Sequence, residues 1–183
     1  MFNPTSIPGL KYWFKPGNWH GLIQPYADCR PKQLNNYLYF DGKNDYLIVK
    51  DLQLKKPITI FLAIGLETHN KKTVLFKTDK QELFLINNRL RYSTGKAVYL
   101  DNVGTKGVCC VRDYKKQIVL NYNNLQLRDV SLLDTQYDSD MLIGGWDGCK
   151  YPLHGGLYHM LIYENAIGDI NTNRIIDYLG ETL

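Results

Sequence analysis

The chain has 183 residues, with 44% hydrophobic and 22% charged residues and a formal net charge of +4. This balance is ordinary for a soluble globular protein and excludes a disordered chain, and the length fits a single domain over residues 1–183, since domains average roughly 100–200 residues. The basic residues never run longer than a pair and accompany no nucleic-acid-binding motif, so we expect no nucleic-acid partner.

Short apolar stretches separated by turn residues predict an all-β protein. Turn signals recur about every 8–12 residues, which is typical of a sandwich or barrel. Aromatic residues reach 13%, with 14 Tyr, and Tyr favours strands. In chain order, the predicted strands are 10–14, 37–40, 46–49, 58–66, 73–77, 82–86, 89–93, 108–111, 117–122, 125–130, 141–143 and 157–163.

Three segments between and within these strands carry further information. Asn87-Asn88 and Asn123-Asn124 predict tight hairpin turns, because Asn tolerates the left-handed backbone that such turns need. Residues 17–35 predict a long loop. The strand 58–66 is apolar on both faces, which predicts burial on both sides.

One short helix is predicted at the C-terminus. Asp169 is expected to be its N-cap and Gly180 its C′ glycine. The expected apolar side of the helix consists of Ile170, Ile175, Ile176 and Leu179.

Several motifs follow one another in an order that resembles a known family. They are residues 8–14 (Pro-Gly-Leu-Lys-Tyr-Trp-Phe), 39–47 (Tyr-Phe-Asp-Gly-Lys-Asn-Asp-Tyr-Leu), 142–145 (Leu-Ile-Gly-Gly), 155–163 (Gly-Gly-Leu-Tyr-His-Met-Leu-Ile-Tyr) and 175–179 (Ile-Ile-Asp-Tyr-Leu). Over nearly the whole chain this order resembles the concanavalin A-like (laminin G-like) domains. The resemblance implies a jelly-roll β-sandwich of two antiparallel sheets with a short C-terminal helix.

The chain departs from that family at one position of the penultimate strand. His159 stands where relatives carry Glu, so the resemblance implies no role that needs a carboxylate there. We expect His159 to be structural, with its side chain hydrogen-bonded near the sheet edge. Asp41, Gly42 and Asp45 are expected to serve turn geometry rather than a metal.

The cysteines and the N-terminal segment point to a reducing compartment. Cys29, Cys109, Cys110 and Cys149 show no metal-binding spacing, so we expect reduced thiols, no metal and no cofactor. The first residues lack a basic segment followed by an apolar one, so no signal peptide is expected. The longest apolar run, 60–66, falls far short of the ~20 residues that span a bilayer, so no membrane insertion is expected.

No catalytic constellation is visible, and we expect a non-enzymatic protein. Glycosidases need a pair of carboxylates, and the Glu-x-Asp-x-x-Glu strand of related glucanases does not occur. Asp138 and Asp140 have a suitable spacing but lie in a predicted loop. Cys149 and His154 lack a third group to orient them as a nucleophile and base.

Loop aromatics provide the candidate binding residues, because sugar rings present apolar faces to flat aromatic side chains. The expected carbohydrate- or partner-binding residues are Trp19, His20 and Tyr26 in the first loop and Trp146, Asp147, Tyr151 and His154 near the C-terminus. Trp146 beside Asp147 combines a stacking ring with an acceptor for sugar hydroxyls. The alternative is that Trp146 caps the sandwich or contacts a partner subunit.

These features leave two main hypotheses about function. The first is a virion structural or host-contact protein of a bacteriophage tail, fibre or capsid decoration, made in the host cytoplasm and contacting virion proteins or host surface glycans. It is expected as a homo-oligomer or part of a larger assembly. The alternative is a stand-alone carbohydrate-binding lectin or module. A glycan-cleaving enzyme is disfavoured because no carboxylate pair is found.

Overall fold

The structure of the chain, a computed structural model, describes residues 2–24, 26–67, 72–114, 116–130, 139–145 and 150–183. Within these residues, one sheet contains β1 (Leu10–Phe14), β3 (Lys32–Gln33), β4 (Leu38–Asp41), β6 (Ile58–Leu66), β11 (Lys106–Asp113), β12 (Gln117–Tyr122), β13 (Leu125–Val130) and β15 (His154–Tyr163). Its hydrogen-bonded order is β13-β12-β11-β6-β15-β4-β3, and β1 also pairs with β15. We refer to it as the eight-stranded sheet.

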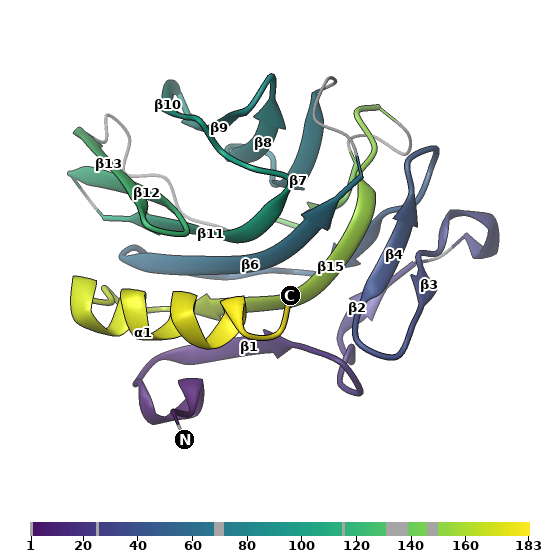
Figure 1. Cartoon of the computed structure of the whole chain (residues 1–183), viewed down its shortest axis with the longest axis horizontal. Helices are drawn as coiled ribbons and strands as arrows, with labels where there is room; N and C mark the ends of the chain where they lie inside the picture. Colours follow the sequence, from purple (N-terminus) through teal and green to yellow (C-terminus); the bar gives the residue numbers. More distant parts are fainter. Residues whose placement is uncertain (1, 25, 68–71, 115, 131–138, 146–149) are drawn as a thin grey trace.

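The other described strands form the seven-stranded sheet. They are β2 (Leu22–Ile23), β5 (Leu47–Val49), β7 (Thr73–Lys77), β8 (Glu82–Ile86), β9 (Arg89–Thr94), β10 (Lys96–Asp101) and β14 (Met141–Ile143), in the order β10-β9-β8-β7-β14-β5-β2. Two short 3₁₀ turns, Pro4–Ser6 and Ala27–Cys29, and the helix α1 (Asp169–Gly180) complete the described elements. All strand pairs among the described residues are antiparallel. The predicted antiparallel β-sandwich with a C-terminal helix is confirmed (Figure 1).

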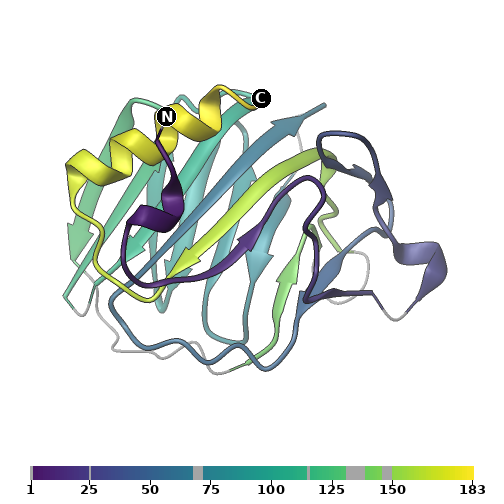
Figure 2. The same cartoon turned by 90° about the horizontal axis from the view of Figure 1, so that it is seen from below.

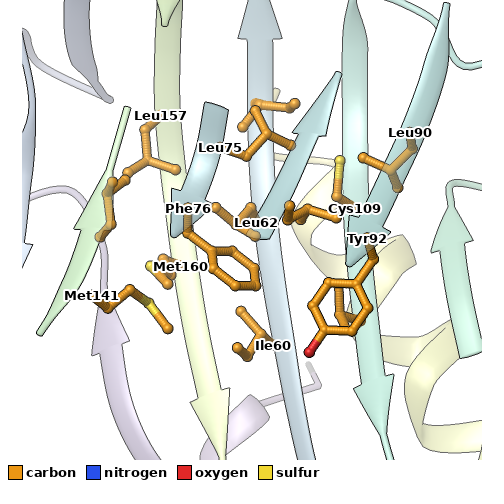
Figure 3. Close-up of a cluster of buried hydrophobic side chains, with 14 of the residues drawn as sticks. Ile60, Leu62, Leu75, Phe76, Leu90, Tyr92, Cys109, Met141, Leu157 and Met160 are labelled. Atoms are coloured by element: carbon orange, nitrogen blue, oxygen red, sulfur yellow. The ribbon is translucent and has the colours of Figure 1, made fainter. Parts of the chain in front are cut away.

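The main core lies between the two sheets. Ile60, Leu62 and Met160 of the eight-stranded sheet are fully buried against Phe76 and Tyr92 of the seven-stranded sheet (Figure 3). Alternate residues of each strand supply this layer, as the pleat of a strand requires. The hydroxyl of Tyr92 donates to Asp113 Oδ2 at 2.8 Å, and Lys56 Nζ lies 2.8 Å from Asp113 Oδ1. This buried ion pair is therefore hydrogen-bonded within the protein interior.

A second core lies on the outer face of the eight-stranded sheet. There α1 packs its Ile175, Ile176 and Leu179 against outward residues of β6, β11 and β15, including Phe61 and Cys110. Figure 2 shows α1 crossing these strands with the N-terminal segment beside it. The predicted burial of 58–66 on both faces is confirmed, and the helix forms a third layer over part of this sheet.

The ends of the helix differ from the prediction. Gly168 is the N-cap, and Asp169 lies in the first turn, where it is 2.6 Å from the guanidinium groups of both Arg112 and Arg128. Asp169 is already the first helical residue, so its side chain does not occupy the N-cap position. Ile170 is 78% exposed, so its assignment to the apolar side was wrong. Glu181 is the C-cap, and Gly180 is the last helical residue rather than C′.

The strand predictions missed elements that leave little pattern. The predicted loop 17–35 contains β2 and β3, two residues each, which are too short for alternation to be read. The strand β10 was also missed, because only Gly95, with φ of 80°, separates it from β9. Asn87 and Asn88 have positive φ, and so does Asn123, as expected of tight turns. Cys109 and Cys110 are both buried on opposite faces of β11. No helix in the described part of the chain is long and apolar enough to cross a membrane.

Candidate functional site

Three strands of the eight-stranded sheet meet at the end that α1 leaves uncovered. The first residue of β15, His154, pairs with Asp41 at the end of β4, and the next residue pairs with Leu66 at the end of β6. The register therefore places outward side chains from three separate segments of the sequence at one rim. We refer to Tyr37, Tyr39, Glu67, His154 and Tyr158 as the His154 cluster.

A hydrogen-bonded network forms one half of the cluster. Nε2 of His154 lies 3.2 Å from the Tyr39 hydroxyl and 2.9 Å from Glu67 Oε2. The hydrogen bond from the Tyr39 hydroxyl to the Glu67 carboxylate raises the pKa of Tyr39, and the negative charge of Glu67 adds to the effect. The side chain of His154 is 35% exposed and that of Glu67 is 50% exposed. A carboxylate, an imidazole and a neutral phenol thus face solvent together, which supplies both acceptors and donors for ligand hydroxyls.

Two tyrosine rings form the other half of the cluster. The rings of Tyr37 and Tyr158 stack with their centroids 4.8 Å apart, and both side chains are partly exposed. They occupy space that only glycine leaves open, since a Cβ on Gly156 would lie 2.8 Å from Tyr37 and 3.0 Å from Tyr158. Gly156 pairs with Gly65 on β6, where a Cβ would lie 3.3 Å from Tyr158. The glycines therefore make room for an aromatic pair on the sheet surface.

The turn after β4 holds His154 from the other side. Gly42 has a φ of 74°, and a Cβ there would lie 2.8 Å from the His154 side chain, so both backbone and space require glycine. Asp45 Oδ2 accepts a 2.8 Å hydrogen bond from the Asp41 backbone N–H, and Asp41 Oδ1 accepts one from Lys43. Asp41, Gly42 and Asp45 thus serve turn geometry, as predicted. Burial raises the pKa of Asp45, and the hydrogen bond from the Asp41 backbone N–H opposes this.

A second aromatic surface crosses the outer face of the seven-stranded sheet. Tyr99, Arg91 and Phe84 are direct partners across β10, β9 and β8. Arg91 lies 4.7 Å from the Phe84 ring and 5.6 Å from the Tyr99 ring, and Lys72 lies 4.2 Å from Phe84 and 4.5 Å from Tyr151. Lys72 and Arg91 also bind Glu82. We refer to Tyr99, Arg91, Phe84, Lys72 and Tyr151 as the tyrosine row.

The two aromatic surfaces differ in what lies against their rings. In the tyrosine row, Phe84 is only 4% exposed, with two cations over its ring, and the exposed rings stand at the two ends. In the His154 cluster, aromatic and polar groups are adjacent and partly exposed. A sugar needs an accessible ring next to hydrogen-bonding groups. The His154 cluster is therefore the candidate site that best fits a sugar.

The residues predicted in the first loop have mixed environments. Trp19 is half-buried against the main core, and its indole Nε1 is buried without a hydrogen-bond partner among the described residues. His20 and Tyr26 are exposed, Tyr26 by 61%. The backbone N–H of Tyr26 donates to Gln24 Oε1, and Gln24 Nε2 donates to the carbonyl of Tyr46. The structure does not bring these three residues into the His154 cluster.

The second predicted group is only partly described. Tyr151, which is 43% exposed, belongs to the tyrosine row, and His154 is at the centre of its cluster. Trp146 and Asp147 lie outside the described residues, as do Cys149 and Asp138. At the neighbouring described residue, Gly145, an added Cβ would lie 3.5 Å from the Cβ of Tyr46.

Sequence reasoning missed four residues of the cluster. Tyr37 and Tyr39 lie before and within β4, Glu67 follows β6, and Tyr158 is on β15. Only the register of β15 with β4 and β6 brings them together. One signal was available and was not used: residues at i and i+2 of a strand share a face, so the predicted strand 37–40 could have placed Tyr37 and Tyr39 together. Nothing in the sequence alone placed them beside Tyr158.

His159 has a structural environment, although not at a sheet edge. It lies on β15, between β1 and β6, is 5% exposed, and its Nδ1 accepts a 3.3 Å hydrogen bond from the indole of Trp13. Burial, and then the charge of Lys15, lowers the pKa of His159 to about 4. The imidazole is therefore neutral at neutral pH. Among the described residues, no group of three or more His, Cys, Asp or Glu could hold a metal ion.

Comparison with known proteins shows the fold and no closer relationship. No protein-family model and no curated protein matches the chain. Among solved structures, the CBM40 module of the Ruminococcus gnavus IT-sialidase bound to α2,3-sialyllactose is 12% identical, with a TM-score of 0.57, over 67% of this chain and 83% of that one. Domain 4 of AbnA, a GH43 extracellular arabinanase from Geobacillus stearothermophilus, in complex with arabinotriose, is 13% identical, with a TM-score of 0.59, over 80% and 79%.

A longer enzyme matches as well. Trypanosoma rangeli sialidase is 13% identical, with a TM-score of 0.61, over 84% of this chain, but the match covers only 29% of the sialidase. Likenesses at this level of identity establish only the β-sandwich fold. They do not establish a function, because function resides in sites rather than in folds. A place in a virion, virion partners and an oligomeric assembly gain no support from these comparisons and stay predictions.

Proposed function

We propose that this chain is a non-catalytic carbohydrate-binding module that holds a glycan at the His154 cluster. One observation carries the proposal: the stacked Tyr37–Tyr158 pair lies beside the Tyr39–His154–Glu67 network on a partly exposed surface. The rings offer apolar faces for sugar C–H groups, and the network offers acceptors and donors for sugar hydroxyls.

The comparisons support a carbohydrate-binding module better than they support a virion protein. The CBM40 module and the AbnA domain match over most of both chains, and their structures contain sialyllactose and arabinotriose. The identity of the sugar that this chain binds does not follow from these structures, because sequence identities of 12–13% support only a shared fold.

The test is a glycan-binding screen with the protein displayed multivalently, since avidity makes weak single sites measurable. We expect a glycan that the wild type binds and that Tyr158→Ala and His154→Ala bind at least about tenfold more weakly, which corresponds to ~1.4 kcal/mol. Tyr158→Phe retains the ring and removes the hydroxyl, so it separates stacking from hydrogen bonding.

Tyr26→Ala is the matched control. Tyr26 is a more exposed tyrosine that lies outside the cluster, so its removal is expected to leave binding unchanged. Trp146→Ala tests the predicted loop site in the same assay. No binding to any glycan, or binding that Tyr26→Ala or Trp146→Ala abolishes while Tyr158→Ala does not, would contradict the proposal.

A further inference from the structure

A polar cleft is lined by the β12–β13 hairpin and helix α1, and none of its described lining residues belongs to either aromatic surface. Its volume is about 410 Å³, within the roughly 300–1,000 Å³ of small-molecule sites. The described residues that line it are Asn121, Asn123, Asn124, Gln126, Asn173 and Asp177. We refer to it as the amide cleft.

Asn121 of β12 forms part of one wall of the cleft, and the buried Arg112 fixes the orientation of its side chain. Arg112 is 1% exposed and donates from Nη1 to Asp169 Oδ1 at 2.6 Å and to the Ile167 carbonyl at 3.3 Å. Its Nη2 donates to Asn121 Oδ1 at 3.3 Å. A guanidinium can only donate, so the oxygen of Asn121 must face Arg112. Asn121 as a whole is 98% buried. Because its oxygen is bound to Arg112, its amide NH₂ is the group that remains to donate to a ligand.

Asn123 is fixed in the same sense. Its Oδ1 accepts a 2.8 Å hydrogen bond from the Val108 backbone N–H, and its own backbone N–H donates to the Val108 carbonyl at 3.0 Å. Its NH₂ group is therefore also available as a donor. The cleft thus has two amide donors whose orientation is set by the protein rather than by the ligand.

The wall formed by α1 supplies the complementary acceptor. Asn173 and Asp177 are one turn apart, so they share a face of the helix, and both are exposed. Asp177 can only accept hydrogen bonds when ionised. Among the described lining residues there is no Lys, Arg or His and no aromatic ring.

We infer that the amide cleft is a second binding site, which takes a neutral polyhydroxylated ligand such as an uncharged sugar residue. A hydroxyl both donates and accepts, so neighbouring hydroxyls can accept from the Asn121 and Asn123 amides and donate to Asp177. An anionic sugar is disfavoured, because Asp177 repels it and no lining cation offsets the repulsion. The site is independent of the His154 cluster, and neither proposal needs the other.

The test uses the full chain labelled with ¹⁵N, with the side-chain NH₂ signals of Asn121 and Asn123 as the readout. Glucose, galactose and mannose are the neutral probes, and glucuronic acid is the anionic probe. We expect saturable shifts of these two signals with at least one neutral sugar and at least about tenfold weaker binding of glucuronic acid.

Three variants assign the shifts to the cleft. Asn173→Ala combined with Asp177→Ala alters only the exposed helix wall, and we expect at least about tenfold weaker binding. Asn121→Asp keeps an oxygen for Arg112 but replaces the donor with an acceptor, so binding is expected to be lost while the thermal melt is retained. Ile170→Ala, an exposed change on the same helix, is the control that should leave binding unchanged.

The inference is overturned if no neutral sugar shifts the two signals, if glucuronic acid binds as tightly, or if the double variant binds like the wild type. Loss of glycan binding in Tyr158→Ala with retained shifts at Asn121 supports the cleft as a separate site. Shifts at Asn121 that disappear in Tyr158→Ala would overturn its independence.

Discussion

The outer face of the eight-stranded sheet has two halves with different outward residues. Under α1, residues such as Phe61, Cys110 and Leu161 point outward, and they are covered by the helix and the N-terminal segment. At the other end, Tyr39, His154 and Tyr158 face outward and stay partly exposed. The difference shows that the outward residues decide which half of the sheet is covered. Apolar outward residues pack against a covering layer, whereas aromatic and polar outward residues leave a surface that ligands can reach.

The largest expected effect tests the covered half. Ile175→Ala or Leu179→Ala removes a fully buried side chain between α1 and the sheet. We expect each to lower the free energy of unfolding by about 2–5 kcal/mol in a urea titration. Ile170→Ala on the same helix should change it by no more than about 0.5 kcal/mol. Equal effects at positions 170 and 175 would show that the helix does not form a covering layer.

The uncovered half should respond in the opposite way. Tyr158→Ala is expected to weaken glycan binding by at least about tenfold, with a loss of stability of about 0.5–1.5 kcal/mol from the broken ring pair with Tyr37. The measurement is a titration of the glycan found in the screen, alongside a thermal melt. A collapsed melt with unaltered binding per folded molecule would assign Tyr158 to the fold rather than to the site.

Acid should destabilise the protein through His159. The pKa is about 4 in the folded chain, below its ordinary 6.5, so between these values the unfolded chain binds a proton that the folded chain does not. The contribution of His159 to the free energy of unfolding is fully present above pH 6.5. It falls by at most about 1.4 kcal/mol per pH unit as pH decreases towards about 4, and then levels off. His159→Gln retains an acceptor for Trp13, and its unfolding free energy should vary less with pH over this range. Identical pH profiles for the two proteins would refute this account.

Asp169 should have the smallest effect, in a lower pH range. Its hydrogen bond to Arg112, reinforced by Arg128, lowers the pKa of this half-exposed carboxyl. Its contribution is present above the ordinary value of 3.8 and is lost as pH falls through the lower folded value. Asp169→Asn should therefore cost about 1 kcal/mol at neutral pH, and the deficit should shrink in strong acid. A deficit in urea denaturation that is unchanged in strong acid would contradict the ion-pair explanation.

The sequence predicted the sandwich better than it predicted the site. Alternation and Asn-Asn turns were sufficient to place most strands, because these signals are local. The packing of the helix on the sheet was not predicted, since Arg112 and Asp169 are 57 residues apart and their contact cannot be inferred from sequence spacing. The cluster was found only at His154, because Glu67 and Tyr158 reach it through the register of β6, β15 and β4.

The most direct test of the central claim is to map the surface that a bound glycan contacts. Hydrogen exchange, measured with and without the glycan from the screen, should show slower exchange around residues 37–41 and 154–158, where the His154 cluster lies. Exchange at β8–β10, under the tyrosine row, should be unchanged. Slower exchange confined to β8–β10, or no change at the His154 cluster when the glycan saturates the protein, would contradict the claim that the uncovered half of the eight-stranded sheet is the glycan-binding surface.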